Sequence, residues 1–333
     1  LSIQAWIFAT KPVGDDYQTI VAQQTSGAGF GLYLNPEGHL TLRLSNTEET
    51  IDVSTDHSLA KNQWYFVVGS FDQKEGTATV IQRQCGRWPN VAADSEHSKK
   101  ISLVKLHAAS VPVSIAATGI SDPKEFIPRQ CFNGKIESPR IFCRPLLSDE
   151  IDHLALDGAP DEISDLVAAW DFSRTPANST TIEDISNNQR HGEVINFPMR
   201  GLTGHNWTGR EFSRKVAPDQ YGGIHFHDDD VEDMQWDTSF KWNLPADIKS
   251  GVYAAYLKAG DEEDFITFFV SDSTAREKIA FLVPTITYLA YANERVLFAG
   301  IDFSGLTNIP IVVDPYDDFL GDHLTEYGGS TYD

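Results

Sequence analysis

The sequence predicts a mainly β protein that contains an antiparallel sandwich, a smaller β unit and the beginning of an α/β domain. Three observations lead to this fold class. Short segments of alternating apolar and polar residues fill the first 210 positions, a second group of such segments lies between residues 220 and 275, and a continuous apolar segment follows. We therefore expect domains at residues 1–212, 213–275 and 276–333.

The sandwich is predicted from strands of period two that are separated by turn residues. Ser2–Thr10 alternates apolar and polar side chains, and Leu40–Leu44 follows the turn Asn35–Gly38. Trp64–Phe71 and Thr77–Gln82 flank a polar segment that ends in glycine. Regular alternation with turn residues between the strands is typical of an antiparallel sandwich.

A short helix and two further strands are expected to complete the sandwich. Ser148 is placed to cap the helix, and Asp149 and Glu150 add negative charge to its first turn. Leu166–Phe172 has the pattern of a strand, and His191–Asn196 follows an asparagine-rich turn with the same pattern. The sandwich is therefore expected to end near residue 210.

Two segments with different patterns of apolar residues follow the predicted sandwich. Ser250–Leu257 alternates well, and the loop Gly260–Asp264 joins it to Phe265–Val270, which we interpret as a small immunoglobulin-like β unit. Lys278–Val283 is a continuous apolar segment before Pro284, as expected of a strand buried on both faces. Because no helix-rich remainder follows to cover this strand, we expect a truncated α/β domain.

The charge of the chain is strongly asymmetric. The protein carries 48 acidic and 26 basic residues, a formal net charge of −22. Residues 1–150 hold 16 acids and 14 bases, and residues 151–333 hold 32 acids and 12 bases. Such a negative field repels phosphate backbones, so nucleic acid is not expected as a partner. Solubility is the preferred explanation of the acidity, and a cation site or a basic partner subunit is the alternative.

Two further features bear on localisation. No apolar run reaches the roughly 18–20 residues that a membrane helix requires, so no membrane association is expected. The three cysteines, Cys85, Cys131 and Cys143, are too few for a disulfide framework. Cys131 and Cys143 could pair across strands, but we expect all three to be reduced packing residues of a cytoplasmic protein.

Two sets of motifs resemble known families. AWIFATKP, LAKNQWYFVVGSF and FNGKIESPRIFCRPLLSDEI are similar to the concanavalin/laminin-G-like jelly roll. Five later segments, with the order of the three units, resemble the large (beta) subunit of N,N-dimethylformamidase. They are AAWDFS (168–173), HGEVINFPMRGLTGHNW (191–207), GGIHFHDDD (222–230), SGVYAAYLKAGDEEDFITFFV (250–270) and LVPTITYLAYANE (282–294). The second resemblance covers essentially the whole chain.

This second resemblance implies an iron-dependent amide hydrolase. In that family the iron is held by tyrosine and glutamate side chains of the α/β domain, a small helical subunit accompanies the large one, and the products are formate and an amine. Ferric iron polarises a carbonyl and lowers the pKa of bound water, and hard phenolate and carboxylate oxygens suit it. We therefore expect a small amide as the substrate, with a small subunit and further copies of the chain as partners.

Tyrosines near the C-terminus are the candidate iron ligands. Seven of the eleven tyrosines lie in residues 251–333. Because ligands in α/β domains follow strand ends, we assign Tyr291 and Tyr332 to the iron, with Tyr288 as the substitute for Tyr291. Tyr288 and Tyr291 could instead be packing residues of the first αβ turn. The resemblance places the glutamate ligand beyond residue 333, so we expect this chain to bind iron poorly and to be inactive alone.

The motif His225–Asp230 is a second possible metal site. Its two histidines are spaced to share one face of a strand, and its three consecutive aspartates could bind calcium, although not with the spacing of an EF-hand loop. We interpret the motif as a strand that runs into a solvated acidic turn. His191 and His205 are expected to be packing or turn residues.

The alternative to an enzyme is a β-sandwich module that binds carbohydrate or a protein partner without catalysis. Exposed tryptophans would then line a groove, and the candidates are Trp88, Trp207, Trp236 and Trp242. A third hypothesis is a structural arm that mediates contacts between subunits.

Overall fold

The computed structural model describes residues 1–290, except for residues 26, 87–93, 103–105, 107–108, 120–127, 176–178, 229–236, 246, 261 and 272–277. The chain divides into two compact units, Leu1–Asp228 and Asp229–Asp333. The first unit holds a sandwich of two antiparallel sheets.

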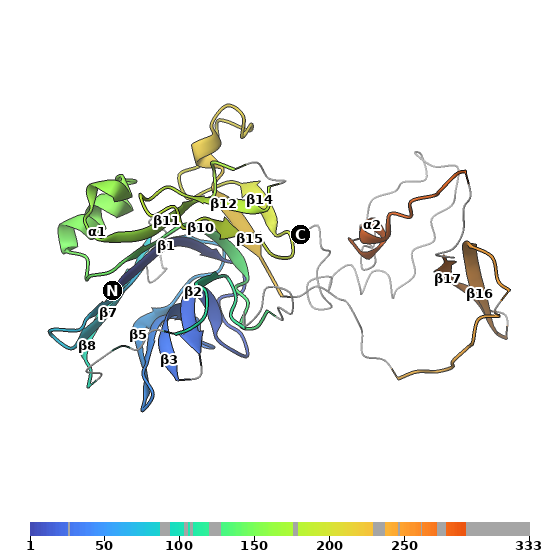
Figure 1. Cartoon of the computed structure of the whole chain (residues 1–333), viewed down its shortest axis with the longest axis horizontal. Helices are drawn as coiled ribbons and strands as arrows, with labels where there is room; N and C mark the ends of the chain where they lie inside the picture. The colour runs from blue at the N-terminus through green and yellow to red at the C-terminus, as the bar shows by residue number, and fades with distance from the viewer. Residues whose placement is uncertain are drawn as a thin grey trace. The chain divides into compact units, whose positions relative to one another are not determined.

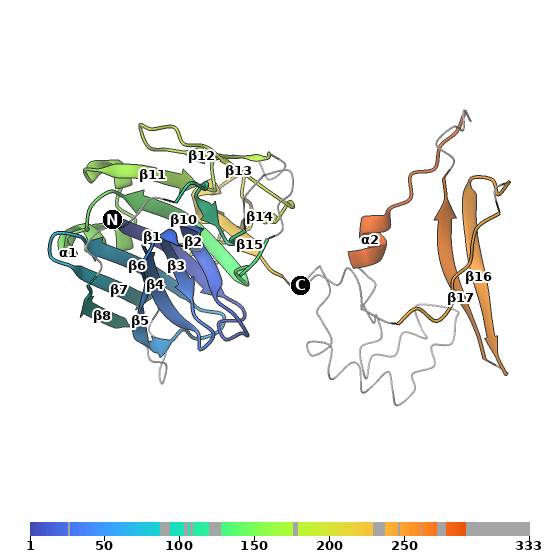
Figure 2. The ribbon, with the colours of Figure 1, turned by 60° about the horizontal axis from the view of Figure 1, so that its bottom comes forward.

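The larger layer of the first unit is a ten-stranded antiparallel sheet. Its main path runs β13-β12-β11-β10-β1-β6-β7-β8, and β15 pairs with both β10 and β14. Figure 2 shows β1, β6, β7 and β8 side by side in this sheet. The strands are β1 (Ser2–Ala9), β6 (Trp64–Asp72), β7 (Thr77–Gln84), β8 (Ser95–Lys100), β10 (Gly134–Phe142), β11 (Leu166–Asp171), β12 (Thr181–Asp184), β13 (Gly192–Glu193), β14 (Met199–Leu202) and β15 (Gly223–Phe226).

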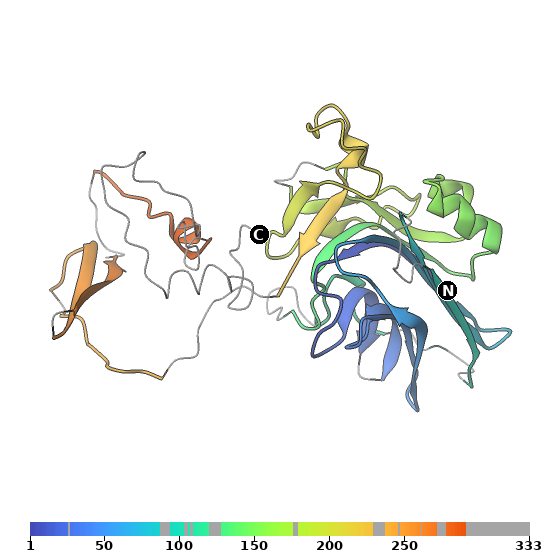
Figure 3. The same ribbon diagram turned by 180° about the vertical axis from the view of Figure 1, so that it is seen from behind.

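The second layer is a five-stranded antiparallel sheet with the order β5-β4-β3-β2-β9. Its strands are β2 (Gln18–Thr25), β3 (Ala28–Leu34), β4 (His39–Ser45), β5 (Thr50–Ser58) and β9 (Ser114–Ile115). Figures 1 and 3, which view the molecule from opposite sides, both place the blue strands of this sheet below the green and yellow strands of the other. Leu32 and Leu42 share one buried cluster with Ile7 and Val67 of the larger sheet. The mainly β fold and the predicted sandwich are therefore confirmed.

A second apolar cluster covers part of the outer face of the ten-stranded sheet. It joins Trp6, Phe66 and Phe142 of the sheet to Ile151 and Leu154 of the helix α1 (Ser148–Ala155). Figure 1 shows α1 beside this sheet. The helix therefore buries part of a sheet face that would otherwise be exposed.

The start of α1 differs by one residue from the sequence expectation. Leu147, rather than Ser148, is the capping residue. The Leu147 amide donates to the Glu150 carboxylate at 2.8 Å, and Arg144 donates to the same carboxylate at 2.6 and 2.8 Å. A glutamate in the first turn can satisfy a free amide of the helix end without a serine cap. Two short 3₁₀ turns, Pro160–Glu162 and Pro218–Gln220, complete the helical part of the first unit as the structure describes it.

The second unit contains a hairpin and a short helix among its described residues. β16 (Gly251–Ala259) pairs antiparallel with β17 (Glu262–Val270), close to the two alternating segments that the sequence predicts. Gly260 adopts a φ of 67° in the connecting loop, where glycine avoids steric strain. α2 (Thr285–Ala290) follows the apolar segment before Pro284.

The strand predicted at Lys278–Val283 is wrong, because these residues form neither strand nor helix. The side chains of Ile279, Phe281 and Leu282 are 88%, 74% and 91% exposed. A strand buried on both faces needs hydrogen-bonded neighbours and covering helices, and the described residues of the second unit supply neither. The apolar side chains of Ile279, Phe281 and Leu282 therefore stay exposed in the described part of the second unit, although their pattern is typical of a buried strand.

The cysteines differ in part from the sequence expectation. All three are free, so Cys131 and Cys143 do not pair. Cys85 and Cys143 are exposed rather than packed, and Cys131 is half-buried.

The two α-helices among the described residues have 8 and 6 residues. Over the described ranges, no helix combines the length and apolar character needed to cross a membrane.

Candidate functional site

Only one of the three proposed iron ligands lies within the described residues. Tyr288 is on α2, is 53% exposed, and its ring lies 6.4 Å from that of Phe269 on β17. Tyr291 and Tyr332 lie outside the described residues. The ring contact of Tyr288 agrees with a packing role, and its role as an iron ligand stays a prediction.

The described residues do not form the metal site that the sequence suggests. Nowhere among them do three histidine, cysteine, aspartate or glutamate side chains gather to hold an ion. His225 and His227 do lie near each other, with ring centroids 5.7 Å apart, as expected for alternate residues of a strand. The next residue, Asp228, donates its amide to the Asn133 side chain at 3.2 Å, and Asp229 and Asp230 lie outside the described residues.

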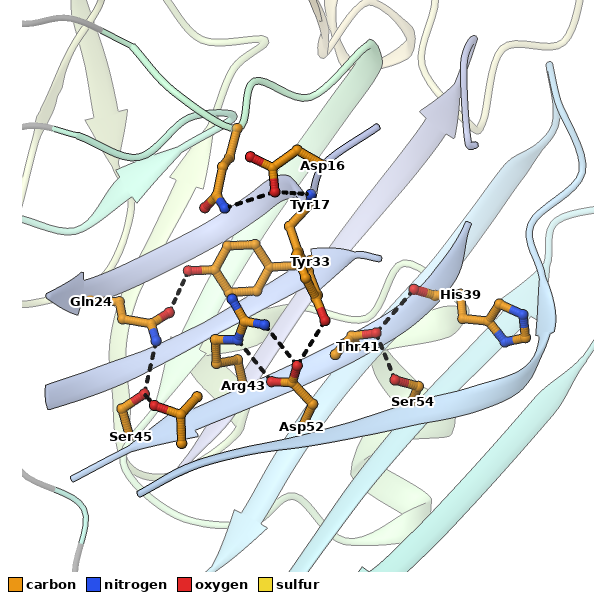
Figure 4. Close-up of polar contacts among 12 residues, drawn as sticks. Asp16, Tyr17, Gln24, Tyr33, His39, Thr41, Arg43, Ser45, Asp52 and Ser54 are labelled. Atoms are coloured by element: carbon orange, nitrogen blue, oxygen red, sulfur yellow. Dashed lines mark hydrogen bonds and ion pairs between the residues drawn. The ribbon is translucent and has the colours of Figure 1, made fainter. Parts of the chain in front are cut away.

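A polar and aromatic surface covers the outer face of the five-stranded sheet (Figure 4). The Arg43 guanidinium donates to both carboxylate oxygens of Asp52 at 2.8 and 2.7 Å and lies 4.0 Å from the centroid of the Tyr17 ring. The Tyr17 hydroxyl donates to Asp52 at 2.9 Å. Bidentate pairing and stacking together hold the guanidinium in one orientation.

The strand alternation explains why these side chains point outward. Leu32 and Leu34 face the core, so Tyr33 between them faces the other side of the sheet. Gly31 leaves room for this ring, because a Cβ at position 31 would lie 2.3 Å from it. The Tyr33 hydroxyl donates to Gln24 at 2.6 Å, and burial raises the pKa of Tyr33. This face of the sheet therefore holds the buried phenol of Tyr33 and the half-buried phenol of Tyr17 beside a paired ion, and their polar groups satisfy one another.

Two of the four tryptophans proposed to line a groove lie within the described residues, one in each unit. Trp207 packs edge-on against Phe212 at 5.9 Å and donates its ring nitrogen to the Glu211 carbonyl at 3.0 Å. Trp242 belongs to the second unit and packs against Phe268. Trp88 and Trp236 lie outside the described residues.

A polar pocket of about 470 Å³ opens beside β12. Arg174 and the carboxylate of Glu183, which are 3.6 Å apart, both line it. His191 also lines it, and its Nδ1 accepts the amide of Asp184 at 3.1 Å, in agreement with the expected turn role. The Asp184 carboxylate accepts the amides of Ala169, Ser186 and Arg190, so it organises the turn. Arg174, Glu183 and Asp184 are thus engaged with the protein itself.

The most unusual cluster of ionisable groups lies on the outer face of the ten-stranded sheet. His205 is hydrogen-bonded through Nδ1 to Glu137 at 2.7 Å and through Nε2 to Asp157 at 2.8 Å. Its ring stacks on Trp6 with centroids 3.7 Å apart and an angle of 11° between the planes. The His205 and Glu137 side chains are only 7% and 4% exposed, and that of Asp157 is 54% exposed. We call these four residues the His205 cluster.

Three separate features of the backbone bring the His205 cluster together. The pairing of β1 with β10 shifts register between Gln4 and Trp6, and Ser138, opposite the shift, has a φ of 48°. A bulge of this kind aims a strand side chain away from the regular alternation, and it leaves Glu137 opposite Trp6. Asp157 follows α1 in the left-handed conformation, with a φ of 61°.

Two glycines allow the chain to approach the buried Glu137 carboxylate. A Cβ at Gly204 would lie 2.3 Å from Glu137 Oε1, and a Cβ at Gly222 would lie 2.6 Å from the same atom. The backbone amide of His205 donates to Glu137 Oε2 at 2.8 Å. The connection between β14 and β15 therefore folds directly onto this carboxylate.

The electrostatics of the cluster favour a charged imidazole. Burial by itself lowers the pKa of His205, but the hydrogen bonds and negative charges of Asp157 and Glu137 outweigh burial and raise the pKa to about 8. The hydrogen bond from His205 lowers the pKa of the Asp157 carboxyl. His205 is therefore a charged residue at neutral pH, and the packing or turn role expected from sequence describes it incompletely.

No feature of the sequence indicates that these residues lie together. Glu137 precedes His205 by 68 positions and Asp157 precedes it by 48. No spacing rule connects residues on a bulged strand, a helix end and a loop. The Ser-Pro dipeptide after Glu137 marks an irregularity in the strand but does not identify the partners of the glutamate.

Comparisons with known proteins assign the two ends of the chain to families. Residues 199–333 match the family model described as N,N-dimethylformamidase beta subunit-like, C-terminal. Residues 1–82 match the concanavalin A-like lectin/glucanases superfamily. A putative carbohydrate-binding protein from Bacteroides ovatus is similar in structure over 57% of this chain and 50% of its own, at 15% identity with a TM-score of 0.42. A likeness at that level supports no functional inference.

Two curated proteins are similar over most or all of the chain. The N,N-dimethylformamidase beta subunit of Paracoccus aminophilus is 33% identical over 351 residues, which cover 100% of this chain and 46% of that protein. The beta subunit from Alcaligenes sp is 31% identical, covering 85% of this chain and 39% of its own. The chain thus spans less than half the length of these relatives. The resemblance seen in the motifs is confirmed, and the chain is a relative of N,N-dimethylformamidase beta subunits that carries a concanavalin-like domain at its N-terminal end.

Proposed function

We propose that this chain is the N-terminal portion of an amide hydrolase large subunit that splits the C–N bond of formamides into formate and an amine. The observation that carries the proposal is the similarity to two N,N-dimethylformamidase beta subunits over 100% and 85% of the chain. Because the chain spans 46% of the first of these relatives, we propose that residues beyond this portion are needed for activity and that the portion is inactive alone.

Iron dependence is part of the same proposal. We assign Tyr291 and Tyr332 to the metal, with Tyr288 as the substitute for Tyr291, and we expect a glutamate ligand outside this chain. The chemistry of the donors supports the assignment, because phenolate and carboxylate oxygens are the ligands that ferric iron prefers. Of the three tyrosines, Tyr288 alone lies within the described residues, and its exposed side chain leaves the hydroxyl accessible to a ligand.

The partners and the location of this chain are also proposals. Both relatives are named beta subunits, which supports a second, different subunit as a partner. We propose that this partner is a small subunit, that the assembly contains further copies of the chain, and that it works in the cytoplasm on a small amide.

The second candidate function is a binding module without catalysis. The half-buried side chains of Tyr17, Arg43 and Asp52 favour it, because aromatic rings and ordered polar groups are common in polar ligand sites. This candidate ranks second because those polar groups already satisfy one another.

The iron assignment is tested with tyrosine variants of the complete subunit. Tyr291→Phe and Tyr332→Phe remove a phenolate but keep the ring, and Tyr253→Phe on β16 is the matched control. We expect both ligand variants to lose iron, measured by elemental analysis, together with the visible absorption of iron phenolate, while the control keeps both. Undiminished iron in Tyr332→Phe excludes Tyr332 as a ligand, and undiminished iron in all variants refutes the tyrosine site.

A further inference from the structure

The His205 cluster ties a long connection of the chain to the sandwich. Residues 203–222 join β14 to β15, and His205 near their beginning contacts Glu137 on β10 and Asp157 after α1. We propose that the His205 cluster is a latch that holds residues 203–222 on the outer face of the ten-stranded sheet and opens when the imidazole loses its second proton. This inference does not depend on the proposed amidase function.

With both carboxylates ionised, the geometry requires both ring nitrogens to carry protons when the latch is closed. Each nitrogen lies 2.7 or 2.8 Å from a carboxylate oxygen, and an ionised carboxylate can only accept. A neutral imidazole has a single N–H, so it can serve only one of the two carboxylates. Its unprotonated nitrogen then faces a negative oxygen across a hydrogen-bond distance, which is repulsive.

The latch is the charged part of a larger contact. Lys135 on β10 donates to the carbonyl and hydroxyl of Thr203 at 3.4 and 3.1 Å, and the Cys85 thiol lies 3.6 Å from the His205 carbonyl oxygen. The Trp6 ring gives His205 a flat apolar support at 3.7 Å. Protonated histidine over an aromatic face gains a cation–π attraction that neutral histidine lacks. Loss of the proton therefore weakens the contacts of His205 with Glu137, Asp157 and Trp6 together.

The other ionisable groups of the surrounding elements bear on the pH at which the latch opens. Arg140 on β10 has a pKa lowered by burial to about 10, and burial raises the pKa of the Cys85 thiol just after β7. Lys135 faces the same connection, and burial lowers its pKa. Asp157 and Glu137 are the acidic partners. Since Lys135 also contacts residues 203–222, its variant must be tested separately from that of His205.

The sign of the pH effect follows from the raised pKa of His205. An unfolded histidine titrates near 6.5 and the closed latch holds its proton up to about 8. The stabilisation is complete below about pH 6.5 and is lost as the pH rises through about 8. A difference of about one and a half pH units makes the opening equilibrium about thirtyfold larger above pH 9 than well below pH 6.5, and about fifteenfold larger than at pH 6.5 itself.

Hydrogen exchange with mass spectrometry tests the latch in the intact chain. Protection of peptides within residues 203–222 is measured from about pH 6.5 to 9.5 and corrected for the intrinsic exchange rate. Peptides from β3 and β4 in the same sample provide an internal reference, because these strands belong to the other sheet. We expect protection of residues 203–222 to fall up to about fifteenfold over this range with a midpoint near pH 8, while the reference peptides keep theirs.

Four variants decide whether His205 causes this step. His205→Gln is expected to give low protection at every pH and no step, and His153→Gln, an exposed histidine with an ion-pair partner at 3.2 Å, is the matched control. Lys135→Gln is expected to keep the step. If His205→Gln does not fold, Asp157→Asn serves instead, because it removes one charge and is expected to lower the midpoint. A step that persists in His205→Gln, a midpoint unmoved by Asp157→Asn, or flat protection in the wild type overturns the proposal.

Discussion

The two units of this chain differ in how far their apolar side chains are buried. In the sandwich, leucines such as Leu32 and Leu42 are fully buried between two sheets. In the second unit, Leu282 is 91% exposed and Phe265 is 61% exposed. A two-stranded hairpin is marginal on its own, whereas a sandwich encloses a core of its own. The difference indicates that residues 1–228 contain what they need to fold and that the described part of the second unit does not.

The largest expected effect comes from separating the units. We expect residues 1–228 expressed alone to unfold in one cooperative transition, because their two sheets enclose a core. The hairpin of residues 251–270 alone is expected to give no cooperative transition and few dispersed amide signals in NMR, because a two-stranded hairpin is marginal on its own. Circular dichroism melts and a proton–nitrogen correlation spectrum of each piece provide the measurement. A cooperative melt of the isolated hairpin would break the comparison.

Two leucine-to-alanine substitutions, one in each unit, test the difference in burial at single residues. Leu42→Ala is expected to lower the free energy of unfolding by about 3 kcal/mol, since it leaves a cavity between the two sheets. Leu282→Ala removes the same atoms from an exposed site and is expected to change it by less than about 0.5 kcal/mol. Urea denaturation followed by fluorescence measures both. Equal losses in the two variants would show that Leu282 is buried in solution.

Ion pairs of the two units provide the smallest expected difference. Arg43 and Asp52 are bidentate, with side chains 19% and 29% exposed, and Arg43 also stacks on Tyr17. We expect a double-mutant cycle with Arg43→Met and Asp52→Asn to give a coupling of about 1 kcal/mol. The Lys258–Glu263 pair of the hairpin is more exposed, and its cycle is expected to give no measurable coupling. The reverse order would contradict the view that the sandwich buries its contacts more completely than the described part of the second unit.

Local pattern predicted the sandwich strands well because each strand carries its own period-two signal. Ser2–Thr10 and Trp64–Phe71 are the expected segments, and the strands are Ser2–Ala9 and Trp64–Asp72. The hairpin of the second unit is predictable from its sequence for the same reason. The short strand β15 is harder to assign to a unit, because it pairs with β10, which lies far earlier in the chain.

The failures arose where burial or contact depends on distant residues. Lys278–Val283 has the composition of a buried strand, but composition does not supply the neighbours that a strand requires. His205 looks like an ordinary turn residue in the sequence, and its charge depends on Glu137 and Asp157, which a bulge and a helix end bring to it. The assignment of Tyr291 and Tyr332 as iron ligands depends on the family resemblance and stays a prediction.

The most direct test of the proposed role in an amide hydrolase is the release of formate from N,N-dimethylformamide. A coupled formate assay compares two samples: the complete subunit purified together with its partner subunit, and the 333-residue chain alone. We predict formate and dimethylamine in equal amounts from the complete assembly and none from the 333-residue chain. Absence of amide hydrolysis by a folded complete assembly, over a panel of small formamides, would contradict the proposal.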